Sequence, residues 1–304
     1  MTTVTRSRRG HRAPRKPSRA YLIAGAGGML GTALQRVLSE QGARFAAPGE
    51  GEFDITDAPA VHKQVGAFAR SLRDGERGVI INAAAYTNVE RAEEEPDIAS
   101  RVNEFGAVQL ARAAHESGLG FVQVSTDFVF DGLKEGAYNE DDEPHPLSVY
   151  GQTKLDGEDS VVAENPDALI VRTAWVFGPA GVNFPVKILE AARTRPALQV
   201  VTDETGSPTY TLDLAAGILG LVAADAGGLY HLAGSGSCSR FELAQRIVEL
   251  AGLDTPIEPV TSDAFPSKAQ RPMNSVLDCS KAAGLGVTMP EWSDALERFM
   301  RELA

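Results

Sequence analysis

A glycine-rich turn near the start of the chain limits the possible folds more than any other feature. The segment YLIAG (21–25) has the short apolar pattern of a buried strand, and TALQRVLSEQG (32–42) has helical periodicity and ends at a glycine. Gly25, Gly28 and Gly31 lie at the junction. Glycines at such a junction allow a tight turn, let a pyrophosphate approach the backbone and let the helix pack closely on the strand. The turn therefore predicts a dinucleotide-binding site that includes these three glycines.

The rest of the chain alternates short β-rich runs with longer helical stretches. The strand-like runs are ARFAA, GVIINAAA, LGFVQVST and ALIVRTAWVFG, and helical stretches cover 58–73, 90–118 with a break at Pro96, and 183–193. Such alternation means parallel strands joined by crossover helices, so it predicts an α/β fold with a Rossmann-type doubly wound parallel sheet. The final third is more irregular and contains a helical stretch at 240–252, which suggests a smaller C-terminal α/β domain.

Charge is distributed unevenly along the chain. Residues 1–19 hold seven of the 29 basic residues and none of the 41 acidic ones, so the remainder is strongly acidic. An acidic body argues against a nucleic-acid partner. We expect the basic segment to be a disordered, dispensable arm, with a twin-arginine export signal or a nucleic-acid-binding tail as alternatives. No apolar run reaches membrane-spanning length, so no membrane partner is expected.

The end of the second predicted strand bears on the choice of cofactor. A site for NADH usually has an acid there that binds the adenosine ribose 2′-hydroxyl. This chain has Pro48 at that place and Glu50 only nearby. Because loss of the acid removes repulsion against a 2′-phosphate, the sequence favours NADPH, with NADH as the alternative. Asp54 and Ile55 are expected on the adenine side of the cofactor.

A second motif, SVYGQTKLDGE (148–158), places Tyr150 and Lys154 four residues apart. On a helix capped near Ser148 this spacing puts both side chains on one face. A lysine ammonium beside the phenol would lower the tyrosine pKa from its ordinary value of about 10 toward neutrality. The pair is suited to protonate the oxyanion that hydride addition to a ketone leaves. Thr126, at the end of the fourth predicted strand, is expected to hold that carbonyl, with Ser125 as a rival.

Taken together, these motifs resemble a known family. The glycine turn, NAAAYTNVERAE, VSTDFVFDG and YGQTKLDGE, in this order, are similar to the extended short-chain dehydrogenase/reductases. More narrowly, RTAWVFG, NFPVKIL, GSPTYT, GLYHLAG and RPMNSVLD resemble the dTDP-4-dehydrorhamnose reductases, from about residue 21 to the C-terminus. The resemblance implies NADPH-dependent reduction of the C4 ketone of dTDP-4-dehydro-L-rhamnose in the cytoplasm, as the last step of dTDP-L-rhamnose synthesis for cell-surface polysaccharide.

The resemblance also implies roles for individual residues. Tyr150 would be the general acid, and Lys154 its activator and a ligand of the nicotinamide ribose. Cofactor contacts would come from Gly25, Gly28, Met29, Leu30, Gly31, Asp54, Ile55, Ala84, Ala85, Tyr86 and Thr87. Contacts to the dTDP-sugar would come from Ser125, Thr126, Asp127, Trp175, Asn183 and Arg271. Two of these have ordinary alternatives, since Trp175 could be a buried strand tryptophan and Arg271 a solvated loop arginine.

By the same resemblance, residues 20–175 with about 208–233 would form the NADP-binding domain. About 176–207 with 234–304 would form a smaller sugar-nucleotide-binding domain. The chain departs from the family at Glu204, where glutamine is frequent. A carboxylate facing the pocket would repel an anionic nucleotide, so we expect Glu204 to face solvent or to pair with a base.

Three alternative functions share parts of this pattern. A sugar-nucleotide dehydratase would need a glutamate after Asp127, where this chain has Phe128. An NAD-dependent epimerase or another NAD(P)-dependent sugar-nucleotide reductase shares the fold. A non-catalytic regulatory protein is the third alternative, because the β subunit of methionine adenosyltransferase resembles the same family and retains a similar tyrosine–lysine motif. The co-occurrence of Trp175 with the GSPT and GLYHLAG segments favours the enzyme.

The sequence gives little support for a metal. Cys238 and Cys279 form no CxxC motif and have no histidine cluster near them in the sequence, so zinc is not expected and a reduced compartment fits. Some members of the family are described as magnesium-dependent dimers. No carboxylate constellation here requires Mg²⁺, and a homodimer is an expectation from the resemblance alone.

Overall fold

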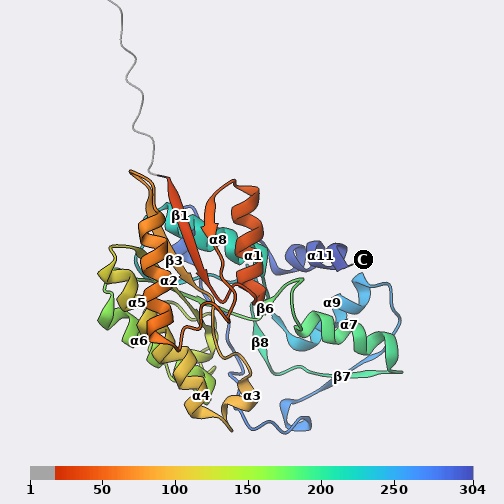
Figure 1. Ribbon diagram of the computed structural model, residues 1–304. Helices are drawn as coiled ribbons and strands as arrows, with labels where there is room; N and C mark the ends of the chain where they lie inside the picture. Colours follow the sequence, from red (N-terminus) through yellow and green to blue (C-terminus); the bar gives the residue numbers. More distant parts are fainter. Residues whose placement is uncertain (1–17, 304) are drawn as a thin grey trace, which may run out of the picture.

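The computed structural model describes residues 18–303 (Figure 1). Most of the basic arm lies outside these residues. Its last residue, Arg19, is the first residue of strand β1 (Arg19–Ala24), and its guanidinium lies 2.5 Å from a carboxylate oxygen of Asp225. Strand β1 therefore begins two residues before Tyr21, where the sequence analysis placed the start of the first strand.

The centre of the molecule is a sheet of six parallel strands in the order β10-β5-β4-β3-β1-β2. The chain builds outward from β1 to β2, then returns past β1 to β3 and continues to the other edge. This reversal next to β1 is where doubly wound sheets bind ligands, and it confirms the predicted fold class. The remaining strands of this sheet are β2 (Arg44–Ala46), β3 (Arg77–Asn82), β4 (Gly120–Thr126), β5 (Leu169–Thr173) and β10 (Gly228–His231).

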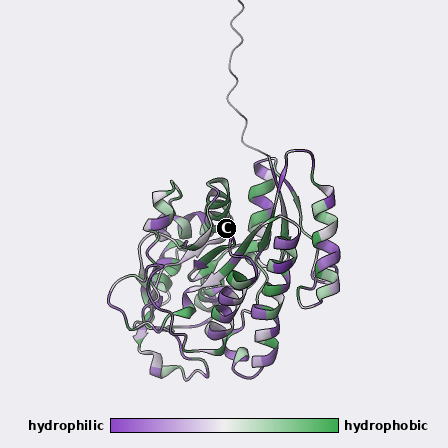
Figure 2. Ribbon diagram, turned by 90° about the vertical axis from the view of Figure 1, so that its left-hand side faces the viewer, coloured by the Kyte–Doolittle hydropathy of each residue, from purple (hydrophilic) through white to green (hydrophobic). Residues whose placement is uncertain are grey.

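Helices cover both faces of the sheet (Figure 1). Because neighbouring side chains on a strand point to opposite faces, Leu22 and Ile23 of β1 belong to two different buried clusters. Figure 2 shows the apolar sheet enclosed by helices that carry hydrophilic residues on their outer sides. On the Ile23 side lie α1 (Met29–Glu40) and α8 (Thr211–Ala223), and on the Leu22 side lie α2 (Ala58–Ser71), α5 (Ala107–Glu116) and α6 (Val149–Glu164).

The predicted helical stretch 90–118 is divided into several elements. Helix α3 (Val89–Ala92) is followed by α4 (Pro96–Ser100), a π-helical segment η1 (Arg101–Gly106) and then α5. The expected break at Pro96 is confirmed, because a proline is accommodated in the first helical turn, where its missing N–H leaves no hydrogen bond unmade. The buried Asn103 of η1 donates hydrogen bonds to the Tyr86 carbonyl at 3.2 Å and to the Thr153 hydroxyl at 3.0 Å. It thus links the loop after β3 to helix α6.

The predicted strand ALIVRTAWVFG is not continuous. It ends at Thr173, and β6 (Val176–Phe177) starts anew after Trp175, whose φ of 44° lies in the left-handed region. A bulky residue there costs on the order of 1 kcal/mol or more. Strand β6 leaves the central sheet and pairs with β9 (Thr209–Tyr210). The prediction of one strand was therefore wrong at the position where the tryptophan turns the chain.

A second region lies beside the sheet and contains α7, α9 and α11 (Figure 1). The rings of Phe177, Tyr210 and Phe299 form its centre, with centroids 5.3 to 5.9 Å apart. Two-stranded sheets join β8 to β11 and β7 to β12. Its elements are α7 (Phe184–Thr194), β7 (Leu198–Val201), β8 (Thr205–Gly206), β11 (Cys238–Ser239), α9 (Arg240–Leu250), β12 (Ile257–Val260), the 3-10 turn η3 (Ser262–Ala264) and α11 (Trp292–Leu303). Helix α10 (Ser280–Gly284) packs instead against β10 of the central sheet, on the Ile23 side.

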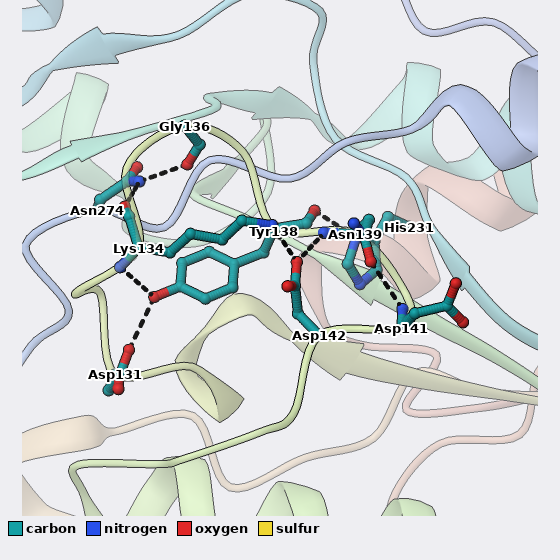
Figure 3. A network of polar contacts seen from close by, with 9 residues as sticks. All are labelled: Asp131, Lys134, Gly136, Tyr138, Asn139, Asp141, Asp142, His231 and Asn274. Atoms are coloured by element: carbon teal, nitrogen blue, oxygen red, sulfur yellow. Dashed lines mark hydrogen bonds and ion pairs between the residues drawn. The ribbon is translucent and has the colours of Figure 1, made fainter.

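A polar network holds the long loop that follows β4 and the 3-10 turn η2 (Asp127–Val129) (Figure 3). The Tyr138 hydroxyl donates to Asp131 at 2.8 Å, and the Tyr138 carbonyl lies 3.1 Å from Nδ1 of His231 on β10. Asn274 donates to the carbonyls of Lys134 and Gly136 at 2.8 and 2.6 Å. The loop is thereby attached both to the sheet edge and to the C-terminal part of the chain.

Across residues 18–303, no helix combines the length and the apolar character that crossing a membrane requires.

Candidate active site

A cavity of about 890 Å³ lies at the carboxyl ends of the central strands. The loops after β1, β3 and β4 and the first turns of α6 form one part of its wall, and Trp175 with the beginnings of α7 and α9 forms another. The predicted site residues that line it are Gly25, Gly28, Met29, Leu30, Asp54, Ile55, Ala84, Ala85, Thr87, Ser125, Thr126, Asp127, Tyr150, Lys154, Trp175 and Arg271. The fold therefore brings together most of the residues that the sequence analysis selected.

The glycine turn leaves the N-terminus of α1 open. Helix α1 starts directly after Gly28, which provides no side chain to cap it. A Cβ at Gly25 would lie 2.5 Å from the Ala84 backbone nitrogen, and one at Gly31 would lie 2.1 Å from the Gly25 carbonyl oxygen. Both glycines are needed for these close approaches, and the uncapped N–H groups of the first turn are suited to bind an anion such as a phosphate.

Two predicted cofactor residues do not line the cavity. Gly31 lies inside α1, where it permits the close packing just described. The Tyr86 hydroxyl donates to Glu95 at 2.8 Å, and its backbone N–H donates to Asn103 at 2.8 Å. At the end of the cavity near β2, Glu50 lies in the wall beside Asp54, so that end carries two carboxylates.

Helix α6 is positioned by its first turn. Ser148 caps it by accepting a hydrogen bond from the Gly151 N–H at 3.2 Å, which confirms the expected cap. A Cβ at Gly151 would lie 2.2 Å from the Phe128 carbonyl oxygen, so only glycine allows the helix to approach the end of β4 this closely. Tyr150 consequently lies next to Thr126 and meets the Phe128 ring edge-on with centroids 5.5 Å apart.

The electrostatics of the tyrosine differ from the sequence expectation. Burial raises the pKa of Tyr150 to about 12, and the charge of Asp127 adds to this, whereas Thr126 lowers it in part. The Nζ of Lys154 donates to the Val124 carbonyl at 2.6 Å. Burial lowers the pKa of Lys154 to about 8. The expected shift of the phenol pKa toward neutrality was therefore wrong, because burial is the largest influence on it and the Lys154 ammonium binds the backbone of β4.

The two candidate hydroxyls at the end of β4, Ser125 and Thr126, differ in their contacts. Thr126 adjoins Tyr150, whereas the Ser125 hydroxyl is buried and has no hydrogen-bond partner among the described residues. The Thr126 hydroxyl donates to Asp127 at 2.9 Å and accepts from the Phe128 N–H at 3.2 Å. Of the two, Thr126 is the one that contacts the phenol, while its role as the group that holds a ketone stays a prediction.

Sequence reasoning missed Arg240, the first residue of α9, which lines the cavity opposite the glycine turn. Its guanidinium lies over the indole of Trp175, 3.4 Å from the ring centroid. Its Nε lies 3.5 Å from a carboxylate oxygen of Glu204, which confirms the expectation that Glu204 pairs with a base. A Cβ at Gly206 would lie 2.3 Å from the indole, so the ring is held between this glycine and the arginine. No local motif marks Arg240, because only the fold brings α9 to Trp175.

The two remaining substrate candidates are engaged with other protein groups. Arg271 reaches the cavity wall, but its Nη2 lies 2.6 Å from Glu90 and its Nη1 donates to Ser267 at 2.9 Å. Asn183 caps α7 and donates to the Gly178 carbonyl at 2.7 Å. Asn183 is absent from the residues that line the described cavity.

In the part of the chain that the structure describes, no group of three or more His, Cys, Asp or Glu side chains is arranged to hold a metal ion.

Comparisons with known proteins identify the family of the chain. The family model of the RmlD substrate-binding domain matches residues 19–304. A dTDP-4-dehydrorhamnose reductase of Mycolicibacterium smegmatis is 40% identical over 283 residues, covering 91% of this chain and 83% of that protein. The spore coat polysaccharide biosynthesis protein SpsK of Bacillus subtilis is 36% identical over 281 residues, covering 92% and 96%.

A solved structure gives the same result. The dTDP-4-dehydrorhamnose reductase of Bacillus anthracis, in complex with NADP, superimposes with a TM-score of 0.88 at 35% identity, covering 94% of this chain and 99% of that one. Because the family model matches residues 19–304 and these relatives match more than 90% of its length, the chain belongs to the dTDP-4-dehydrorhamnose reductase family.

Proposed function

We propose that this chain reduces the C4 ketone of dTDP-4-dehydro-L-rhamnose to dTDP-L-rhamnose, with NADPH as the hydride donor. The observation that carries the proposal is that a partly buried phenol, Tyr150, and an uncapped helix N-terminus after Gly28 line the same cavity. One supplies a proton and the other binds a phosphate, which are the two requirements of a dinucleotide-dependent ketone reductase. The activity named for the relatives, and the NADP complex of one of them, support it.

The cavity fits a dinucleotide cofactor. The first turn of α1 would hold its pyrophosphate, Asp54 and Ile55 its adenosine, and Ala84, Ala85 and Thr87 the part above β3, since all of these line the cavity. When bound there, the cofactor would supply hydride to the ketone carbon. NADPH is favoured by Pro48 and by the relative with NADP, while the exposed Glu50 would oppose a 2′-phosphate. The ratio of kcat/KM with NADPH to that with NADH, in the parent and in Glu50→Gln, measures this balance.

In the proposed reaction Tyr150 donates its proton to the oxygen of the reduced ketone. With a pKa of about 12 the phenol stays protonated at neutral pH. It is still a stronger acid than an alcohol, whose acidity is close to that of water with a pKa of about 15.7. Thr126 keeps the phenol in place, and the ammonium of Lys154 on the same helix face favours the phenolate that proton transfer leaves.

We assign the two ends of the cavity to different parts of the chain. The glycine turn and the ends of β3 and β4 would bind cofactor, and Trp175 with the start of α9 would bind the sugar. This division supports an NADP-binding domain of 20–175 with about 208–233 and a sugar-nucleotide-binding domain of about 176–207 with 234–304. A homodimer and a cytoplasmic role in cell-surface polysaccharide synthesis complete the proposal.

The test measures oxidation of the cofactor and identifies the product in the same reaction. Purified full-length protein should oxidise NADPH when dTDP-4-dehydro-L-rhamnose is added, with dTDP-L-rhamnose as the product identified by mass spectrometry and NMR. The UDP- and GDP-linked ketosugars serve as controls for the nucleotide base. A folded protein that binds NADPH but oxidises it with none of these ketones would refute the enzymatic function and leave a regulatory binding role.

A further inference from the structure

Among the polar side chains that line the cavity, Asp127 and Arg240 have no function in the reaction described above. Asp127 is 2% exposed, and one of its carboxylate oxygens accepts the hydrogen bond from Thr126. Its other oxygen, Oδ2, is buried and has no hydrogen-bond partner among the described residues. Because a buried acceptor without a partner destabilises the protein, such an atom in the wall of a binding cavity indicates a ligand donor.

The second group is the outer edge of the Arg240 guanidinium. The backbone N–H of Arg240 donates to the Glu204 carbonyl at 3.1 Å, and Nε faces the Glu204 carboxylate. The plane of the guanidinium is fixed on Trp175, with the Phe184 ring 5.0 Å away. Within residues 18–303 neither Nη atom has a hydrogen-bond acceptor, although only 18% of the side chain is exposed. Its free donors are thus held rigidly at the cavity wall.

The local charges identify the kind of ligand. Burial raises the pKa of the Asp127 carboxyl to about 6, while the nearby hydroxyls of Ser275 and Thr126 and the charge of Arg240 lower it in part, so Arg240 lies near this carboxyl. The carboxylates of Glu204 and Asp127 together offset the charge of Arg240. The site therefore has no net positive charge with which to bind a phosphate. A neutral group that both donates and accepts hydrogen bonds fits this pair better, and a hydroxyl has that property.

The position of the pair identifies the hydroxyl. Asp127 follows Thr126, which adjoins the proton donor Tyr150, so the pair lies beside the reacting ketone. We propose that Arg240 and Asp127 together bind the sugar hydroxyl on C3, next to the ketone, with Arg240 donating and Asp127 accepting, and that this makes the enzyme specific for a hydroxylated sugar. The inference rests on the proposed function and names the group on the substrate that the site recognises.

The experiment compares kcat/KM for dTDP-4-dehydro-L-rhamnose with kcat/KM for its analogue without the C3 hydroxyl. The parent should prefer the hydroxylated sugar by at least about tenfold, because the analogue leaves both protein groups unpaired. In Arg240→Met and in Asp127→Asn the preference should fall to about threefold or less. Asp127→Asn retains an acceptor for Thr126 but places donors against Arg240.

Two controls separate recognition from structure. Arg246→Met removes an arginine from the same helix, where it pairs with Glu249 and Glu297 outside the cavity, and should keep the parent's preference. The affinity for dTDP, which lacks the hexose, should be unchanged in Arg240→Met. A variant that slows both sugars equally, or that weakens dTDP binding as strongly as sugar turnover, would overturn the proposal. Arg240→Lys, which keeps the charge but has no planar fork, should lose most of the preference too.

A binding measurement distinguishes failure of this inference from failure of the proposed function. Calorimetry should show that dTDP-L-rhamnose binds the parent more tightly than dTDP does, and that Arg240→Met loses this difference. If the parent is inactive but shows this pattern, the reductase function is refuted and the recognition pair stands. If an active parent shows no difference that depends on Arg240, the pair is refuted and the function stands. A parent that binds neither ligand refutes both.

Discussion

Arg172 on β5 holds Glu158 on α6 with three hydrogen bonds, from Nε to Oε1 at 3.0 Å and to Oε2 at 3.1 Å and from Nη2 to Oε2 at 2.6 Å, with both side chains buried. Glu158 lies one helical turn after Lys154, and Arg172 is paired in register with Ser125 of β4. The ion pair thus joins the tyrosine–lysine helix to the sheet immediately beside the site.

Glu158→Gln should lower the free energy of unfolding by about 3 kcal/mol, because it leaves the Arg172 charge buried and uncompensated. Urea denaturation measures the change. Glu164→Gln is the matched control on the same helix, since its partner Arg112 is solvent-accessible, and it should cost at most about 1 kcal/mol. If both variants lost the same free energy of unfolding, the buried pair of Glu158 would stabilise the protein no more than the solvent-accessible pair of Glu164.

Tyr150→Phe should reduce kcat by roughly 10²- to 10⁴-fold, which is the usual contribution of a positioned proton donor. The Kd for NADPH should stay the same, because the phenol hydroxyl is the only group removed. Steady-state kinetics and fluorescence titration measure the two quantities. Tyr230→Phe, which removes a hydroxyl outside the cavity, is the control. If Tyr150→Phe turned over as fast as the parent, another residue would have to be the proton donor.

His231 should make the protein less stable in acid. Burial lowers the pKa of its imidazole from 6.5 to about 4, so the unfolded chain binds the proton first as pH falls. Its contribution is present above pH 6.5 and is lost between pH 6.5 and about pH 4, with a total of about 3 kcal/mol. The difference in unfolding free energy between the parent and His231→Gln, measured from pH 7 to pH 4, should shrink by that amount. A constant difference would contradict the prediction.

Gly206→Ala should impair substrate binding without affecting the cofactor. The added Cβ would lie 2.3 Å from the Trp175 indole and would push the ring into the cavity, at a cost of roughly 1–3 kcal/mol. We expect KM for the sugar nucleotide to rise about tenfold or more, with the Kd for NADPH unchanged. Gly284→Ala, where a Cβ meets open space, should behave as the parent. An unchanged KM would mean that the indole does not contact the sugar.

The sequence predicts the part of the cavity around the glycine turn and α6 far better than the part around Trp175 and α9. Strand-to-helix junctions determine where Gly25 and Gly28 lie, and helical spacing alone brings Tyr150 and Lys154 to one face, so local patterns suffice. Arg240 reaches Trp175 only through tertiary packing of α9, which leaves no local signal. The direction of the Tyr150 pKa shift was wrong for the same reason, because burial depends on the whole fold.

The left-handed turn at Trp175 has a consequence for engineering. It lies where the chain leaves the central sheet, and the residues that hold its indole, Gly206 and Arg240, come from outside that sheet. Tyr150 and the glycine turn are built on the sheet side. A library that varies positions 204, 206 and 240 could therefore retarget the catalyst to other ketosugars while its hydride and proton chemistry stays intact.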